Sequence, residues 1–228
     1  KTMSHAFGDT GKFEVGVDYE EFSKIGTVAG NDCVQTFEGE LGKEYLQRWQ
    51  DMAMNYTFQR SVAPNSPIFN SEDHIISDGD TRFIPASHIR TAYWTQALHG
   101  QGAATTWVWE RGQQGDLAEN ILTRAQCVRA LGRIGLDLNR LGKEMVALQQ
   151  IEPEVAILYS FSSMLPSNDF ADEATAAFEG MHFSDAPCEF VTERQATAGK
   201  RKDHKLVIAP NTSHVSADVV TSLQDYLD

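Results

Sequence analysis

The chain has 228 residues, a formal net charge of -13 and a hydrophobic content of 41%. Such a negative charge repels phosphate backbones and argues against nucleic acid as a partner, while no apolar run approaches the roughly 18 residues that a membrane span needs. The three cysteines, Cys33, Cys127 and Cys188, show no Cys-x-x-Cys spacing, so the sequence indicates neither a disulfide framework nor a zinc site. We therefore expect reduced thiols, a cytoplasmic location, and one large domain or two smaller ones.

The first forty residues contain one candidate site residue. The chain begins at Lys1 without an initiator methionine or the apolar core of a signal peptide, so we expect it to be cut from a longer protein. Residues 19–25 are suited to a turn of helix, and a short apolar run at 27–30 is followed by polar residues. Among these, Asp32 is either a substrate-binding group or the cap of a helix or turn.

An amphipathic helix is predicted from residue 42 to residue 62. Tyr45, Trp49, Met52 and Tyr56 recur at intervals of three and four, which is the spacing of one helical face. Such a stripe of aromatic and methionine residues is typical of a surface that faces the core rather than of a cofactor site.

A short strand followed by polar residues is predicted at 67–76. The apolar run Pro67–Phe69 indicates a buried strand that breaks at Asn70, and Glu72 and His74 follow it. In barrels of alternating strands and helices, catalytic groups lie at the carboxyl ends of strands. We therefore interpret Glu72 as a candidate catalytic carboxylate. The alternative is a solvated loop in which His74 caps a turn.

A second transition from strand to polar residues follows one helix later. Residues 85–100 are predicted to form a helix with Gly100 as its C-cap, and a strand from Ala103 to Trp109 runs into Glu110 and Arg111. Two such transitions separated by a helix are typical of a parallel sheet, in which the strand ends share one edge. The sequence therefore predicts an α/β fold here.

The last part of the chain indicates more helices and a second sheet. Residues 116–150 predict one long helix or two in succession, and we expect the boundary between domains 1–150 and 151–228 at Glu152-Pro153. Beyond it, residues 155–160 and 205–209 are predicted as buried parallel strands, with a further strand at 189–191 and helices at 169–181 and 216–227. This alternation predicts a small doubly wound α/β domain.

A distinctive stretch runs from Trp94 to Gly115 and reads Trp-Thr-Gln-Ala-Leu-His-Gly-Gln-Gly-Ala-Ala-Thr-Thr-Trp-Val-Trp-Glu-Arg-Gly-Gln-Gln-Gly. It resembles the Trp…Gln-Ala…His-Gly-Ala-Asp helix and the final barrel strand of the β-galactosidases of glycoside hydrolase family 42. It departs from that pattern at Gln101-Gly102, near where the family has Ala-Asp. Glu110 also interrupts the usual aromatic-then-arginine end of the strand. At both positions the resemblance therefore does not determine which sugar the protein binds.

The resemblance extends over nearly the whole chain. It makes residues 1–150 similar to the C-terminal half of a (β/α)8 TIM barrel, with residues 1–3 in the fifth strand and residues 30–32 at the end of the sixth. It implies that Glu72 is the nucleophile and that the general acid/base lies at the end of the fourth strand, upstream of Lys1. Residues 151–228 resemble the trimerisation domain of these enzymes, a glutamine-amidotransferase-like fold without that activity.

Five further residues are candidates for substrate binding, besides Asp32: His74, His99, Trp107, Trp109 and Arg111. The two tryptophans are two residues apart in the sequence, so both point to one side of a strand. There they either stack on a sugar ring or pack in the wall of the barrel. The two histidines contact substrate hydroxyls or are structural. Arg111 lowers the pKa of the Glu72 nucleophile or pairs with a neighbouring glutamate.

These features together predict a retaining glycoside hydrolase of β-galactosidase type that acts on carbohydrate without a metal or organic cofactor. The alternative from a different class is a non-catalytic carbohydrate-binding or oligomer-assembly module. A half-barrel leaves strand edges unpaired, which favours a homo-oligomer, and the resemblance suggests a trimer. Metal-dependent hydrolysis with His74, Asp73 and Asp78 as ligands is a third interpretation, although this spacing matches no established site.

Overall fold

The structure is a computed structural model that describes residues 6–7, 18–32, 49–76, 80, 82–110 and 120–227, without the side chains of residues 201 and 202. The chain forms two compact units. Unit 1 consists of Lys1–Ser4, Val28–Tyr56 and Ser66–Gln150, and unit 2 consists of His5–Thr27, Thr57–Asn65 and Ile151–Asp228. The described part of the chain contains no helix that is both long and apolar enough to cross a membrane.

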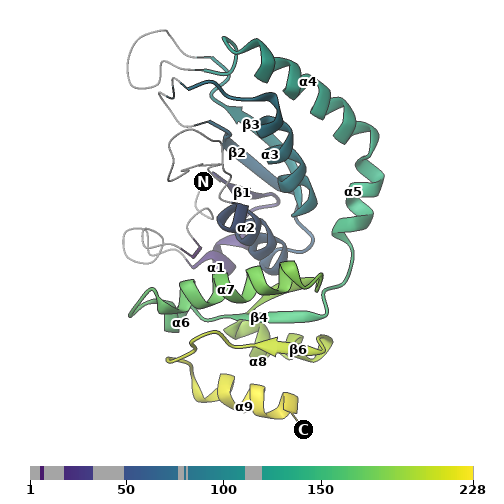
Figure 1. Ribbon diagram of the computed structural model, residues 1–228. Coiled ribbons are helices and arrows are strands. Elements are labelled where there is room, and N and C mark those ends of the chain that lie inside the picture. The colour runs from purple at the N-terminus through teal and green to yellow at the C-terminus, as the bar shows by residue number, and fades with distance from the viewer. Residues whose placement is uncertain are drawn as a thin grey trace. The chain divides into compact units, whose positions relative to one another are not determined.

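Unit 1 is built on a parallel sheet. Its strands are β1 (Ala29–Asn31), β2 (Ile68–His74) and β3 (Gln101–Trp107), and they lie side by side in that order. The helix α2 (Trp49–Val62) precedes β2, and α3 (Ala86–Leu98) lies between β2 and β3 in the chain (Figure 1). The predicted parallel alternation of strands and helices is confirmed here, and the carboxyl ends of all three strands meet at one edge.

The helices of unit 1 end where the sequence indicates. After α3, Gly100 has a φ of 119°, a conformation that glycine adopts at the end of a helix without steric cost. The predicted helical region before residue 150 forms two helices, α4 (Ala125–Arg140) and α5 (Gly142–Gln149), which meet at Leu141. Residues 116–119, where that region was predicted to begin, lie outside the described residues, and residues 120–124 are not helical, so the prediction was wrong for this part.

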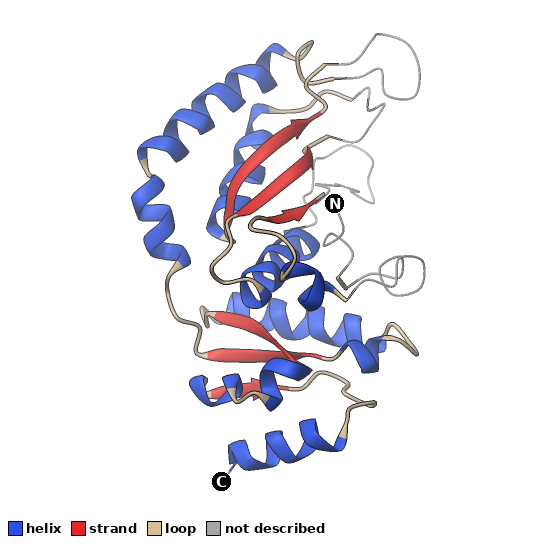
Figure 2. Ribbon diagram, turned by 180° about the vertical axis from the view of Figure 1, so that it is seen from behind, coloured by secondary structure: helices blue, strands red, loops and turns tan. Residues whose placement is uncertain are grey.

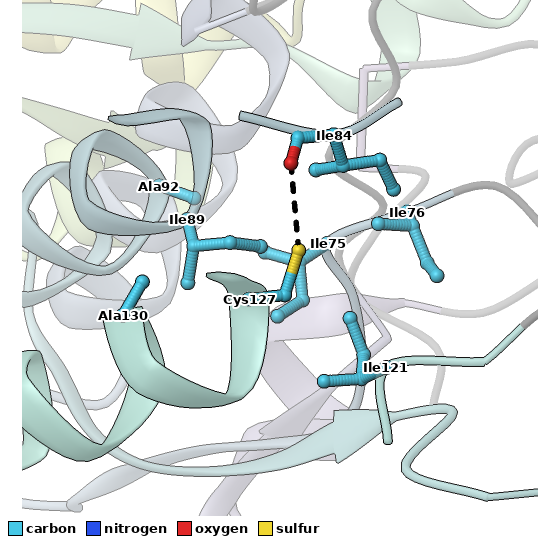
Figure 3. Packing of buried hydrophobic residues seen from close by; sticks show 8 residues of the cluster. All are labelled: Ile75, Ile76, Ile84, Ile89, Ala92, Ile121, Cys127 and Ala130. Carbon is cyan, nitrogen blue, oxygen red and sulfur yellow. Dashed lines mark hydrogen bonds between the residues drawn. The ribbon is translucent and has the colours of Figure 1, made fainter. Parts of the chain in front are cut away.

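The core of unit 1 lies next to the carboxyl end of β2. Ile75 and Ile76 follow this strand directly and are buried with residues of α3 and α4, as Figure 3 shows. The Cys127 thiol of α4 lies 3.7 Å from the carbonyl oxygen of Ile84. Each fully buried isoleucine contributes roughly 1.5–3 kcal/mol, so the end of β2 is fixed by hydrophobic packing.

Unit 2 contains a second parallel sheet. Its strands β4 (Val155–Tyr159), β5 (Cys188–Thr192) and β6 (Leu206–Ile208) have the order β5-β4-β6. The helix α7 (Asp169–Phe183) covers one face, and α8 (Glu193–Thr197) and α9 (Ala217–Leu227) cover the other (Figures 1 and 2). The short helices α1 (Tyr19–Ser23) and α6 (Phe161–Met164) and the 3₁₀ turn η3 (Lys200–Asp203) also belong to this unit, as does the end of α2 from Thr57 onward.

The central strand β4 is buried on both faces, as its continuous apolar sequence predicts. Leu158 packs with Val191 and with Val219 of α9. The neighbouring residue Tyr159 points the other way, and its ring lies 6.2 Å from that of Phe170 in α7. Alternate residues of one strand therefore bind helices on opposite faces of the sheet.

Candidate active site

The strand β2 carries the residue that we interpreted as the nucleophile. The sequence predicts that the strand breaks at Asn70, but it continues to His74, and Glu72 lies inside it. The prediction of a break was wrong because pairing with β3 continues through Asp73 and His74, opposite Thr106 and Trp107. Tertiary pairing therefore overrides the low strand propensity of the polar residues.

The pairing of β2 with β3 shifts register between Ile68 and Phe69 and again between Asn70 and Asp73, and the second shift is a β-bulge in the stretch that contains Glu72. Asn70 pairs with Ala104 and Asp73 pairs with Thr106, so three steps along β2 match two steps along β3. A bulge of this kind interrupts the alternation of side chains and turns one of them to the other face. Asn70 and Asp73 are both fully buried, whereas Glu72 is partly exposed.

Two adjacent strands bring three polar side chains together at the carboxyl edge of the sheet. His74 Nε2 lies 3.4 Å from Asp32 Oδ1 and 3.7 Å from Glu72 Oε2. The three side chains are between 15% and 23% exposed. Asp32 follows β1 directly, so the predicted grouping of polar residues at neighbouring strand ends places it beside Glu72. The cluster is accessible to a ligand and is still held by rigid elements.

Trp107 forms a wall beside this cluster, but Trp109 does not. The rings of His74 and Trp107 are 5.3 Å apart with an interplanar angle of 33°. The strand ends at Trp107, so the expected placement of both tryptophans on one side of a strand was wrong. Trp109 instead lines a cavity of about 480 Å³ together with residues of α3, α4 and α5.

Two other predicted site residues are not part of the cluster. His99 is the C-cap of α3 and stands before the first residue of β3. Because the strands are parallel, this is the amino end of the sheet, opposite to the edge that carries Glu72. Arg111 lies outside the described residues, and its pairing with Glu72 stays a prediction.

The cluster offers ligands to a cation as well as to a sugar. Asp32, Glu72 and His74 each present one ligand atom, and these atoms lie within 4.8 Å of one another. This differs from the set that the sequence suggested, because Asp73 is fully buried in the network described next and Asp78 lies outside the described residues. Carboxylates also accept hydrogen bonds from sugar hydroxyls, and an imidazole can accept or donate one.

Sequence reasoning did not identify a buried polar network behind Glu72. Asp73 Oδ1 accepts hydrogen bonds from Gln96 Nε2 at 2.7 Å and from Asn70 Nδ2 at 3.2 Å. Burial raises the pKa of Asp73 to about 7, although the Gln96 hydrogen bond offsets part of the rise. Residues 70 and 73 are an odd number apart, which puts them on opposite faces of a regular strand. The spacing therefore gave no signal for their contact.

The fold of the described chain belongs to the class of α/β folds seen in glycoside hydrolases of family GH42. An apo exo-carrageenase GH42 from Bacteroides ovatus is 23% identical, with a TM-score of 0.77 over 93% of this chain and 31% of that chain. A catalytic mutant of Gan42B, a GH42 β-galactosidase from G. stearothermophilus, is 16% identical, with a TM-score of 0.68 over 92% of this chain and 32% of that chain. The chain thus spans about a third of the length of these proteins. No protein-family model and no curated protein matches the sequence.

Proposed function

We propose that this chain is part of a retaining glycoside hydrolase of β-galactosidase type in which Glu72 is the nucleophile. The observation that carries the proposal is the cluster of Glu72, His74 and Asp32 at the carboxyl edge of a parallel sheet, within a fold similar to GH42 glycoside hydrolases. In this interpretation, residues 1–150 form the C-terminal half of a (β/α)8 barrel, and residues 151–228 form an amidotransferase-like domain that assembles the enzyme into a homo-oligomer.

The geometry supports nucleophilic attack followed by hydrolysis. A carboxylate oxygen of Glu72 forms a bond to the anomeric carbon while the bond from that carbon to the leaving oxygen breaks, and water later hydrolyses the glycosyl ester. Because Glu72 emerges from a paired strand, the oxygen that attacks is held in place without a mobile loop.

The other residues of the cluster suit substrate binding. The Asp32 side chain is 23% exposed beside His74, so its carboxylate can accept a hydrogen bond from a sugar hydroxyl. His74 approaches both carboxylates, and the Trp107 ring beside it offers an apolar face for a pyranose ring. We assign these three residues to substrate binding.

The general acid/base is proposed to lie outside the cluster. A retaining glycosidase has two catalytic carboxyl groups about 5 to 5.5 Å apart, of which one stays protonated to protonate the leaving oxygen. Asp32 lies near Glu72, but it also lies beside His74, and we assign both of these side chains to substrate binding. The acid is therefore expected upstream of Lys1 in the complete enzyme.

A test of the nucleophile should not depend on the general acid. With 2,4-dinitrophenyl 2-deoxy-2-fluoro-β-D-galactoside, the electron pair of the broken bond leaves on dinitrophenolate, which needs no proton. The fluorine slows hydrolysis of the ester, so we expect intact mass to rise by one fluorogalactosyl group. Peptide mapping should place this group on Glu72.

The matched controls for this experiment are Glu72→Gln and Glu110→Gln. Both remove one carboxylate near the carboxyl edge of the sheet, but Glu110 is exposed and outside the cluster. We expect no adduct on the Glu72 variant and normal labelling of the Glu110 variant. Labelling at another carboxylate, or equal labelling of both variants, contradicts the assignment.

A second candidate function is a non-catalytic carbohydrate-binding or oligomer-assembly module. The observation that favours it is the open sheet of unit 1, which has β1 and β3 at its edges in the described part of the chain. Edge strands pair readily with another chain. Such a module binds galactose without forming an adduct, and light scattering would give a multiple of 25.3 kDa.

A further inference from the structure

The bulge in β2 decides which side chain faces the cluster. In a regular strand, side chains alternate between the two faces, so Ile68, Asn70 and Glu72 would share the face that α3 covers. The extra residue before Asp73 reverses this order. Asp73 then takes the buried face, where Gln96 of α3 reaches it. Glu72 turns to the face that carries His74.

The side chain of Asn70 contacts both ends of the bulge. Its Oδ1 accepts a hydrogen bond from the backbone N–H of Glu72 at 3.3 Å, and its Nδ2 donates to Asp73 Oδ1 at 3.2 Å. A bulged residue loses its ladder partner, and a buried N–H without a partner costs about 1–3 kcal/mol. The Asn70 side chain therefore gives the backbone N–H of Glu72 a hydrogen bond within the interrupted part of the ladder.

The orientation of the Asn70 amide is fixed by a second layer of contacts. Asp73 Oδ1 also accepts a hydrogen bond from Gln96 Nε2 at 2.7 Å. All three side chains, Asn70, Asp73 and Gln96, are fully buried. Rotating the amide by half a turn would bring its oxygen against the Asp73 oxygen and its nitrogen against the Glu72 N–H, so only one orientation is compatible with both bonds.

We propose that Asn70 is a positioning residue for Glu72, and that Asp73 and Gln96 hold the Asn70 amide in the one orientation that maintains the bulge. The expected effect of Asn70 on the reaction rests on the proposed function of Glu72 as nucleophile. The role of Asn70 in maintaining the bulge does not depend on that function. Asn70 touches no substrate, because its side chain lies on the buried face of the strand. It acts through the backbone of Glu72.

The test measures fluorogalactosyl labelling over a range of reagent concentrations, which separates the maximal labelling rate from the half-saturating concentration. A displacement of about 1 Å at the nucleophile can cost on the order of a hundredfold in rate. We expect Asn70→Leu to lower the maximal rate by about that factor and to leave the half-saturating concentration within about twofold of the original value.

Two variants of Asp73 separate positioning from mere burial of a polar group. In Asp73→Asn, the side-chain oxygen still accepts from Asn70 and Gln96, so the maximal rate should stay close to that of the original protein. In Asp73→Leu, no acceptor remains, and the rate should fall as it does in Asn70→Leu. A matched control is Asn55→Leu, which removes another buried amide, in α2, whose Nδ2 donates to the carbonyl oxygen of Asp51.

The proposal is overturned if Asn70→Leu is labelled at the original maximal rate, or if the maximal rate of Asn55→Leu falls by the same factor. It is also overturned if Asn70→Leu changes only the half-saturating concentration. Amide hydrogen exchange at Glu72 gives a second readout that needs no activity. We expect exchange at this N–H to be at least tenfold faster in Asn70→Leu, and unchanged exchange rejects the proposal. If the original protein forms no adduct while this exchange still accelerates, the proposed function fails and the bulge assignment stands.

Discussion

The two units both place polar side chains at the carboxyl ends of parallel strands, but they use them differently. In unit 2, Ser160 follows β4, caps α6 and donates to Glu193 Oε1 at 2.6 Å. Thr192 follows β5 and forms a capping box with Gln195 at the start of α8. In unit 1, Asp32 follows β1, starts no helix that the structure describes, and has one buried oxygen without a hydrogen-bond partner among the described residues.

The same contrast holds for the charges near each edge. A cavity of about 130 Å³ opens at the strand ends of unit 2, but its Arg194 pairs with Asp18 and Glu20. In unit 1, His74 lies 3.4 and 3.7 Å from two carboxylates, beyond the usual hydrogen-bond range of roughly 2.7–3.2 Å. The polar strand ends of unit 1 therefore gather around His74 as one partly exposed cluster, whereas those of unit 2 form helix caps and ion pairs.

The largest expected difference between the units concerns pH. Burial raises the pKa of Asp73 in unit 1 to about 7 from its ordinary 3.8. The folded state therefore binds a proton more tightly, and this contribution to stability is complete below the unfolded pKa and is lost as the pH rises through the folded pKa. The expected loss is at most about 1.4 kcal/mol per pH unit. In unit 2, partial burial alone would raise the pKa of Asp18, but hydrogen bonds from Arg194 and Glu21 lower it, so that contribution is lost as the pH falls.

Tryptophan fluorescence isolates the first of these effects, because all four tryptophans belong to unit 1. Urea unfolding followed by fluorescence should show falling stability from about pH 5 to pH 7. Asp73→Asn should remove this slope. The same slope in the variant would show that another group is responsible.

A smaller effect is expected from Asp32→Asn, which tests whether the open edge of unit 1 binds substrate. Loss of a hydrogen bond to a charged group costs about 1.5–3 kcal/mol, so the labelling efficiency should fall by about tenfold to a hundredfold. If Asp32 only binds and the general acid lies upstream of Lys1, the dinitrophenyl reagent labels the original protein and the phenyl reagent, whose leaving group needs a proton, does not. A loss confined to the phenyl reagent would make Asp32 the general acid instead.

The sequence predicts the elements of the fold better than the geometry of this site. The apolar spacing before Tyr56 and the run at 155–159 correctly indicate a helix and a buried strand, because burial of one face dominates both. The extension of β2 through Glu72 was not predicted, since it depends on pairing with β3. The strand β3 also begins and ends two residues earlier than predicted, which moves Trp109 away from the cluster.

The next effect tests the structural use of polar groups in unit 2. Ser160→Ala removes the N-cap of α6, whose oxygen accepts from Ser163 N–H, and such a loss costs about 1 kcal/mol. Amide hydrogen exchange in residues 155–164 should accelerate, while labelling of Glu72 in unit 1 stays unchanged. Slower labelling would show that the strand ends of unit 2 also serve the reaction.

The smallest effect is expected from removal of divalent cations, which tests the other chemistry that the unit 1 cluster allows. A cation bridging Asp32, Glu72 and His74 would draw negative charge from the Glu72 carboxylate that must attack the anomeric carbon, so metal binding would slow nucleophilic attack. We therefore expect the same labelling rate in EDTA as in Mn²⁺ or Zn²⁺ at micromolar concentration, with an unchanged melting temperature. A metal-dependent rise in that temperature, absent in His74→Gln, would instead assign the cluster to a cation, because a ligand that binds only the folded state stabilises it.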